Sequence, residues 1–360
     1  MSIDTGTLTR TGGAAAREPD GWLALHIFYT AASRPLITQC IRPLIAELRE
    51  RDLIAGHFFI NYWLEGPHVR LRLRPASPAA TPEVRERAEA AIDAFLRIRP
   101  ALYEVTSDHL LDYYDKLFEM EYPQGDRGPY ADDNGRMRLR DNNTYSYEPY
   151  EPEYDKYGGP AGVALAEWHF EHSSDLVAEV DRTMNVHLRT VRLGVSAQLM
   201  MVMATTFLGD DAAVAEFMNG YKAFWHRSFA GSGFVEDAAY ARNYAVTADR
   251  VGRRFAQIRQ ALRDGTTESF PPFLRAWADH CRELGERVRE LSAAGELIFR
   301  SASRGGARHP LTDADEALRI LLNPYIHMTN NRLGTTIGDE SYLAYVAARS
   351  LGEHRGGEAG

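Results

Sequence analysis

The chain has 360 residues, is 44% apolar and carries a formal net charge of −9. This length and composition are enough to bury a substantial core, whereas the acidic balance argues against a general nucleic-acid binder. No run of about 18 uncharged apolar residues occurs, so we expect no membrane span. The two cysteines, Cys40 and Cys281, argue against a disulfide framework or a cysteine zinc site and favour a reducing cytoplasm.

The first third of the chain predicts strands and helices in alternation. Residues 1–18 are small and polar, which is typical of a disordered lead-in and not of a secretion signal. Strands are expected at 22–29, 57–63 and 68–74, the last two forming a hairpin around a Gly-Pro turn, with helices at 35–52 and 82–98. Residues 121–150 are rich in Tyr, Asp, Asn and Gly without an apolar period, which predicts a long inserted loop.

The remainder of the chain predicts a series of helices. Helical spacing and capping residues place them at 161–180, 187–207, 210–227, 235–263, 271–294, 313–330 and from 339 to about 351. A basic link is expected at 304–310, a kink at Pro324 and a flexible tail at 353–360. Because no repeat or strong linker separates these parts, we expect one α+β domain over 19–352, with a mainly antiparallel sheet packed with many α-helices.

The strand at 68–74 reads HVRLRLR, so its side chains alternate between two chemical types. Successive residues of a strand face opposite sides of the sheet. One face therefore carries His68, Arg70, Arg72 and Arg74 at intervals of about 7 Å, and the other is apolar. Guanidinium groups bind carboxylates with two parallel hydrogen bonds, which favours an anion site. The alternative is a solvated outer face of a hairpin, which the pattern alone favours.

Two further segments offer candidate catalytic groups. The stretch YEPEYDKYGG at 150–159 contains Glu153 and Lys156. The Glu153 carboxylate could orient the Lys156 cation or act as a base. The alternative is a turn with solvent-facing charges that leads into a helix. His327 lies in NPYIHMTNNRLG, where a histidine either transfers protons near neutral pH or is a satisfied core residue. In both cases the pattern alone favours the structural interpretation, a solvent-facing turn for 150–159 and a satisfied core residue for His327.

Taken in order, these segments resemble a known family. The stretch HFFINYWLEGPHVRLRLR is similar to an aromatic strand followed by G-P-H-x-R-x-R. The stretch YEPEYDKYGGPAGVALAEWHFEHSS is similar to Y-x-P-E-x-x-R-Y-G-G followed by a helix ending F-x-x-S-S, and YIHMTNNRLG is similar to H-M-x-x-N-R-L. The ordered set resembles the C-terminal domain of lantibiotic dehydratases, also called thiopeptide-type bacteriocin biosynthesis proteins, as a stand-alone member, over about residues 22–351.

The resemblance implies maturation of a ribosomally made precursor peptide, by elimination of glutamate from glutamylated Ser or Thr to give dehydroalanine or dehydrobutyrine. It implies catalytic roles for Arg70, Arg72, Glu153, Lys156 and His327. It implies substrate-binding roles for His68, Arg74, Tyr157, Asn331 and Arg332. Lys156 stands where the family has an arginine. Lysine keeps the positive charge of arginine but lacks its bidentate fork.

The resemblance also implies which partners and cofactors the chain needs. The expected partners are a precursor peptide, with leader and core, and a separate glutamyl-tRNA-dependent glutamylating enzyme. No cofactor, metal, membrane or direct nucleic-acid contact is expected, and the oligomeric state is left open, a homodimer included.

Three other functions compete with elimination. Some family members join two dehydroalanines in an aza-[4+2] cycloaddition that forms a pyridine. The chain could also be a non-catalytic subunit that binds leader peptide for a split dehydratase. A metal hydrolase would use Glu167, His169, Glu171 and His172 of EWHFEH, which lack the H-E-x-x-H spacing and more often belong to helix packing.

Overall fold

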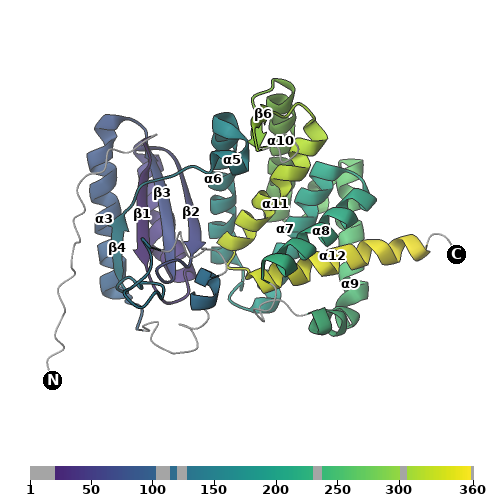
Figure 1. Cartoon of the computed structure of the whole chain (residues 1–360), viewed down its shortest axis with the longest axis horizontal. Helices are drawn as coiled ribbons and strands as arrows, with labels where there is room; N and C mark the ends of the chain where they lie inside the picture. Colours follow the sequence, from purple (N-terminus) through teal and green to yellow (C-terminus); the bar gives the residue numbers. More distant parts are fainter. Residues whose placement is uncertain (1–20, 103–113, 120–127, 230–236, 301–305, 358–360) are drawn as a thin grey trace. The chain divides into compact units, whose positions relative to one another are not determined.

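The computed structural model describes residues 21–102, 114–119, 128–229, 237–300 and 306–357. Contacts between these residues divide the chain into two compact units, Met1–Glu151 and Pro152–Gly360. Both lie within an α+β chain with an antiparallel sheet at the N-terminal end and many helices after it, as the sequence predicts (Figure 1). The predicted lead-in at 1–18 lies outside the described residues.

The first unit is built on a four-stranded antiparallel sheet in the order β2-β3-β1-β4. Its strands are β1 (Leu23–Phe28), β2 (Ile54–Tyr62), β3 (His68–Pro75) and β4 (Thr144–Tyr147). Its helical segments are α1 (Arg34–Leu36), a π-helical turn (Ile37–Ile41), α2 (Arg42–Glu50), a 3-10 turn (Pro78–Ala80) and α3 (Thr81–Ile98). The predicted hairpin is confirmed, and β3 lies inside the sheet between β2 and β1.

Helices α2 and α3 pack on one face of this sheet. Arg49 of α2 contacts His57 of β2 at 3.4 Å, and Arg85 of α3 lies over the Tyr147 ring of β4. His57 pairs with Leu73, so the covered face is the apolar face of β3. The alternation of β3 therefore divides its side chains as the sequence predicts, and the arginines occupy the opposite face.

Part of the segment predicted as a long loop is a strand. Residues 144–147 form β4, which pairs with β1 through Tyr145 opposite Ile27 and Tyr147 opposite Leu25. Tyrosine alternating with Thr and Ser is a period-two pattern that suits a half-buried edge strand. The prediction missed it because the alternating residues are aromatic with a hydroxyl and not aliphatic. Residues 121–127 of the same segment lie outside the described part.

The second unit is mainly helical. Its elements are α5 (Tyr154–Tyr157), α6 (Gly159–Thr183), α7 (Arg189–Leu208), α8 (Asp211–Ser228), α9 (Asp237–Asp264), a 3-10 turn (Thr267–Ser269), α10 (Pro272–Ala293), β5 (Ile298–Arg300), β6 (Arg308–Pro310), α11 (Ala314–Arg332) and α12 (Ile337–Gly357). The predicted helices are confirmed. The basic link predicted at 304–310 instead contains β6, which pairs with β5, and α12 continues past Leu351.

Helix α7 forms part of the core of the second unit. Among the described residues it is the one helix long and apolar enough to cross a membrane by length and composition, and 56% of its apolar window is buried inside the fold. Its neighbours α8, α9, α10, α11 and α12 all contact it. A central position among five helices accounts for its apolar character, because core helices are apolar on most sides.

Candidate functional site

The cationic face of β3 runs from an exposed end to a buried end. Arg74 is exposed and Arg70 is half-buried, whereas Arg72 is 5% and His68 4% exposed. The burial of Arg72 rules out the solvated outer face that the pattern alone favoured. Strand β1 adds His26 to the same face, because His26 pairs with Arg70 across the ladder.

Two histidines accept hydrogen bonds from the two central arginines. Arg72 Nη2 donates to His26 Nε2 at 3.2 Å, and Arg70 Nε donates to His68 Nε2 at 3.2 Å. The other nitrogen of His68 donates to the carbonyl of Gly66 at 2.8 Å. The two imidazoles stack with centroids 5.0 Å apart.

Both imidazoles are neutral near neutral pH. Burial and then the neighbouring guanidinium charges lower the pKa of His26 far below its ordinary value. Burial lowers the pKa of His68 to about 3, with Arg70 and Arg72 adding to the effect. The two rings therefore orient the arginines without competing for an anion, so the positive charge of the cluster stays with the guanidinium groups.

Two nitrogens of Arg72 can donate further hydrogen bonds. Its Nε and Nη1 are buried and have no hydrogen-bond partner among the described residues. Burial, and then the charge of Arg70, lowers its pKa to about 9, so the group stays cationic at neutral pH. A buried guanidinium with unsatisfied donors is costly. A bound anion would accept hydrogen bonds from these donors. The Tyr150 ring lies 5.6 Å from this guanidinium.

Aromatic rings flank the other arginines of the strand. The Arg70 guanidinium lies 3.4 Å from the Tyr62 ring centroid, and the Arg74 guanidinium lies 5.2 Å from that of Trp22. Stacking on a ring fixes a guanidinium plane without using its hydrogen-bond donors. The sequence marked the arginines of this face, whereas His26, Tyr62 and Tyr150 become visible only once the strands are paired.

The second unit brings together the two candidate groups of the 150–159 segment. Glu153 precedes α5, and its carboxylate pairs with Lys156 Nζ at 3.1 Å. The side chains are 58% and 39% exposed. Next to them, Asp155 pairs with Arg300 of β5 and Arg308 of β6 at 2.6 and 2.8 Å. These two hydrogen bonds lower the pKa of Asp155.

The glycines that follow serve the backbone. Gly158 and Gly159 have φ of +85° and +82°, a region that favours glycine, and Gly158 accepts a hydrogen bond from the Ile298 amide at 2.9 Å. A Cβ added at Gly162 would lie 1.7 Å from the Tyr157 carbonyl oxygen. Tyr157 is buried and stacks on Tyr325. The motif therefore folds a tight turn that seats Tyr157 in the core.

His327 is held by a buried carboxylate. Its Nδ1 donates to Glu340 Oε1 at 3.0 Å, and the Tyr221 hydroxyl donates to the second Glu340 oxygen. Trp225 lies one helical turn after Tyr221, and its ring centroid is 5.0 Å from that of His327. The side chains of His327 and Glu340 are 27% and 1% exposed. Burial and then the Glu340 charge raise the pKa of Tyr221 well above its ordinary value, so Tyr221 is a donor.

Local sequence places both members of this pair. Helix α11 begins after Asp313, whose carboxylate accepts from the amides of Asp315 and Glu316. Helix α12 begins with a reciprocal capping pair, in which Thr336 Oγ1 accepts from the Asp339 amide and Asp339 accepts from the Thr336 amide. Glu340 therefore lies in the first turn, where the helix dipole favours a carboxylate. The T-x-x-D-E pattern was the signal that could have revealed it.

Arg332 connects two of the sequence motifs. It is buried, and its Nε donates to Ser174 Oγ at 3.1 Å while Nη1 donates to the Met328 carbonyl at 2.8 Å. Its guanidinium also lies 4.7 Å from the centroid of the Phe170 ring. Phe170 and Ser174 belong to the F-x-x-S-S segment. These contacts fix α11 against α6, and Asn331 beside them is half-buried.

The EWHFEH histidines take part in a stacked cluster with α10. His169 Nδ1 and His280 Nε2 are 2.9 Å apart, and the His172 ring stacks on His280 with centroids 4.7 Å apart. His172 Nδ1 donates to the Trp168 carbonyl at 2.9 Å. Burial lowers the pKa of His169 well below its ordinary value and that of His280 to about 3. These contacts favour the packing interpretation of the segment.

The structure therefore assembles three groups of candidate residues, one in the first unit and two in the second. In the first unit, Arg70, Arg72 and His68 form one cluster with His26. In the second unit, Glu153 pairs with Lys156, and His327 pairs with Glu340 and Tyr221. The first unit offers fixed cations for an anionic group, and the second unit offers an oriented imidazole for proton transfer.

Comparison with known proteins gives the family and the fold. The chain resembles the pyridine synthase TbtD from thiomuracin biosynthesis (TM-score 0.71, 20% identity, 94% of this chain and 99% of that chain). It also resembles TsrL (TM-score 0.64, 17% identity, 93% and 95%). The tRNA-dependent lantibiotic dehydratase MibB from Microbispora sp. 107891 aligns with 29% of its length at a TM-score of 0.49 and 18% identity, over 97% of this chain.

No curated protein matches the chain. Residues 22–351 match the family described as the C-terminal part of lantibiotic biosynthesis dehydratases. This range contains the cluster on β3, the Glu153–Lys156 pair and the His327–Glu340 pair. The chain belongs to the lantibiotic biosynthesis dehydratase C-terminal family.

Proposed function

We propose that the chain eliminates glutamate from glutamylated Ser or Thr residues of a ribosomally made precursor peptide. The observation that carries the proposal is the hydrogen bond from His327 Nδ1 to the buried Glu340 carboxylate. A base whose ring is oriented by a third group is the arrangement that proton-transfer catalysis requires. Family membership supports the peptide substrate.

His327 is the proton-transfer group of this proposal. With Nδ1 bonded to Glu340, Nε2 is the nitrogen that accepts the α-proton of the glutamylated residue. The electron pair of the broken Cα–H bond forms the Cα=Cβ double bond as the Cβ–O bond breaks. Glutamate leaves with that oxygen, so the products are the dehydro residue, glutamate and a proton held on His327.

Arg72 is the anion-binding group of the proposal. The leaving glutamate carries carboxylates, and the developing enolate carries negative charge on the peptide oxygen. A guanidinium whose Nε and Nη1 find no partner in the described part of the chain suits either of these charges. Arg70 contributes a second charge whose Nε is already bonded to His68, so its role is mainly electrostatic.

The Glu153–Lys156 pair is assigned a supporting role. Lys156 stands at the family's arginine position, and its ammonium already contacts both carboxylate oxygens of Glu153. Lysine cannot bind a carboxylate bidentately, so the arginines of β3 are assigned the recognition of the anion. A separate glutamyl-tRNA-dependent enzyme would supply the glutamylated peptide.

A second candidate reaction is the aza-[4+2] cycloaddition of two dehydroalanines. It is favoured by the likeness to a pyridine synthase that covers 99% of that protein and 94% of this chain. Cycloaddition does not require glutamate to be recognised as a leaving group. The buried guanidinium with unsatisfied donors at Arg72 therefore favours elimination.

The test is mass spectrometry of a glutamylated Ser/Thr peptide incubated with the purified full chain. Elimination yields a peptide lighter by one water than the unmodified peptide, whereas ester hydrolysis restores the unmodified mass. A parallel incubation uses a peptide with two dehydroalanines. Pyridine formation there, with the glutamylated peptide unchanged, would replace elimination by cycloaddition. Recovery of both peptides unchanged would favour the leader-binding subunit.

A further inference from the structure

The second unit contains a cavity that none of the proposed catalytic residues lines. Its volume is about 790 Å³. It lies along the C-terminal half of α9, the turn that follows, the start of α8 and one residue of α12. The lining residues that carry the argument are Asp211, Arg254, Gln257, Arg259, Gln260 and Arg263.

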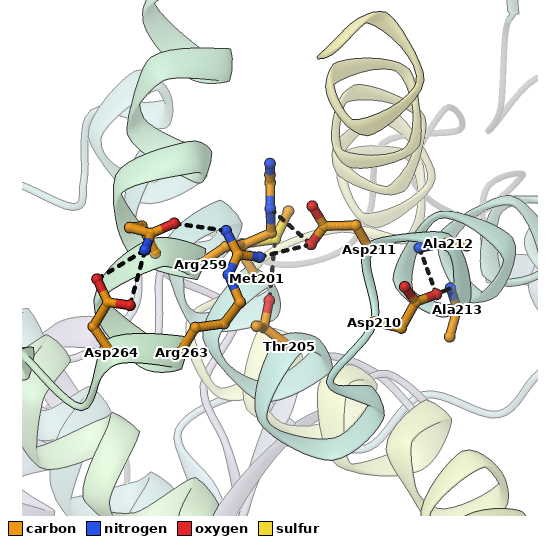
Figure 2. Close-up of polar contacts among 10 residues, drawn as sticks. Met201, Thr205, Asp210, Asp211, Ala212, Ala213, Arg259, Arg263 and Asp264 are labelled. Atoms are coloured by element: carbon orange, nitrogen blue, oxygen red, sulfur yellow. Dashed lines mark hydrogen bonds and ion pairs between the residues drawn. The ribbon is translucent and has the colours of Figure 1, made fainter. Parts of the chain in front are cut away.

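The cavity lining has an excess of positive charge. The lining contains three arginines of α9 and a single carboxylate, Asp211. Arg259 Nε lies 3.1 Å and Arg263 Nη1 3.3 Å from the same oxygen, Asp211 Oδ1, so the two guanidinium groups converge on it (Figure 2). Asp264 nearby is bonded to the amide of Gln260 at 2.8 and 2.9 Å. One carboxylate oxygen therefore serves two cations.

Arg259 is the fixed element of this group. Its side chain is 4% exposed, and its buried Nη1 has no hydrogen-bond partner among the described residues. Burial is the main reason that its pKa is lowered, and Asp211 opposes the effect. Arg263 is more exposed, and its Nη2 donates to Gln260 Oε1 at 3.0 Å. Because Arg263 shares the Asp211 carboxylate with Arg259, its charge is only partly neutralised and can attract an anion.

The separation of the two outer arginines of the cavity suits a peptide better than a single ion. Arg254 and Arg263 both line the cavity but are nine positions, or about two and a half turns, apart on α9, so they leave opposite sides of the helix about 13 Å apart along its axis. An extended peptide covers that distance with about four residues. The lining also contains the Gln257 amide and the Ser269 hydroxyl, which can pair with peptide groups, and the Phe270 ring.

We infer that this cavity binds an acidic segment of the peptide substrate, away from the residues that perform the chemistry. Carboxylates of the segment would pair with Arg254 and Arg263, while Arg259 and Asp211 hold the site in shape. Arg254 Nε is bonded to Gln198 Oε1 at 2.8 Å, which leaves its terminal nitrogens for a ligand. The peptide class rests on the proposed function, whereas the affinity for carboxylates does not.

The test measures binding of a labelled peptide with four consecutive glutamates by fluorescence anisotropy, using the full chain. Saturable binding is expected for this peptide and not for its four-glutamine counterpart. Arg263→Gln and Arg254→Gln should each weaken binding about fivefold or more. The matched control is Arg253→Gln on the exposed side of the same helix, outside the lining, which should change affinity less than twofold.

A further variant reverses the direction of the effect. Asp211→Asn removes the competing carboxylate and should tighten binding of the glutamate peptide several-fold. Equal losses in Arg253→Gln and Arg263→Gln, or equal affinity for the glutamine peptide, would overturn the site. Binding of inorganic phosphate without saturable binding of the glutamate peptide would overturn the peptide assignment and leave a site for small anions.

Turnover measurements separate this inference from the proposed function. With a short glutamylated peptide that lacks acidic residues, Arg263→Gln should leave turnover unchanged. With a longer peptide that contains an acidic segment, the same variant should raise KM without changing kcat. If the chain bound the glutamate peptide but eliminated no glutamate, the proposed elimination would be rejected and the binding cavity would be kept.

Discussion

The His327 imidazole and the Glu340 carboxylate form a hydrogen-bonded pair, with Nδ1 and Oε1 3.0 Å apart, across the junction of α11 and α12. Helix capping places Glu340 in the first turn of α12, and Tyr221 occupies its second oxygen. The carboxylate cannot turn away from His327 without losing the Tyr221 bond. The orientation of the imidazole is therefore built into the packing of three helices.

Replacing Glu340 with Gln should lower kcat for elimination about 100-fold or more with little change in KM. The amide keeps the shape but removes the charge that stabilises the protonated imidazole. Steady-state rates on a glutamylated peptide measure the effect, and circular dichroism confirms folding. Glu316→Gln on the exposed start of α11 is the control. A KM increase at unchanged kcat would contradict the positioning role.

Replacing Arg72 with Lys should lower kcat/KM about 10- to 100-fold, because lysine keeps the charge but loses the planar fork. Arg74→Lys, at the exposed end of the same strand, should have a small effect. Full activity of Arg72→Lys would show that a point charge suffices, and the carboxylate-recognition role would fall.

Replacing Ser174 with Ala should reduce stability by about 1–3 kcal/mol, because the buried Arg332 Nε loses its partner. Activity per folded molecule should be unchanged if Arg332 serves packing alone. Urea unfolding and steady-state kinetics are measured together. A raised KM at unchanged stability would instead support the predicted substrate-binding role of Arg332.

Replacing Gly162 with Ala should destabilise the chain by more than about 4 kcal/mol or prevent folding. The added methyl group would meet the Tyr157 carbonyl oxygen at 1.7 Å. Gly220→Ala is the control, since a Cβ there meets nothing within 4 Å and alanine favours a helix interior by about 0.5–1 kcal/mol. Equal thermal midpoints for the two variants would refute the steric account of the motif.

Stability should fall as the pH drops below about 6.5. His68 and His280 have folded pKa values of about 3, so between these limits the unfolded chain binds protons that the folded chain does not. Each such histidine contributes about 1.4 kcal/mol per pH unit. Urea unfolding at pH 7 and pH 5 measures the slope. His280→Gln should reduce it, whereas His187→Gln at an exposed position should not.

The sequence by itself determined the elements and the chemistry of the motifs. Two-residue and helical periods place β1, β2, β3 and the long helices, because side-chain periodicity follows from local backbone geometry. The ordered motifs gave the family. The sequence did not predict β4, β5 and β6, because strands of three or four residues are too short to show a side-chain period and are defined by pairing with a neighbouring strand.

Only the tertiary structure decided which motif residues are free for chemistry. The pattern of β3 alone favoured a solvent-exposed Arg72, whereas the paired strands bury it beside His26. Arg332 looked available for substrate, and α6 supplies Ser174 to hold it. His327 gained Glu340 and Tyr221 from helices that follow and precede it. Burial and hydrogen-bond partners are long-range properties, since they depend on chain segments that meet only in the folded state.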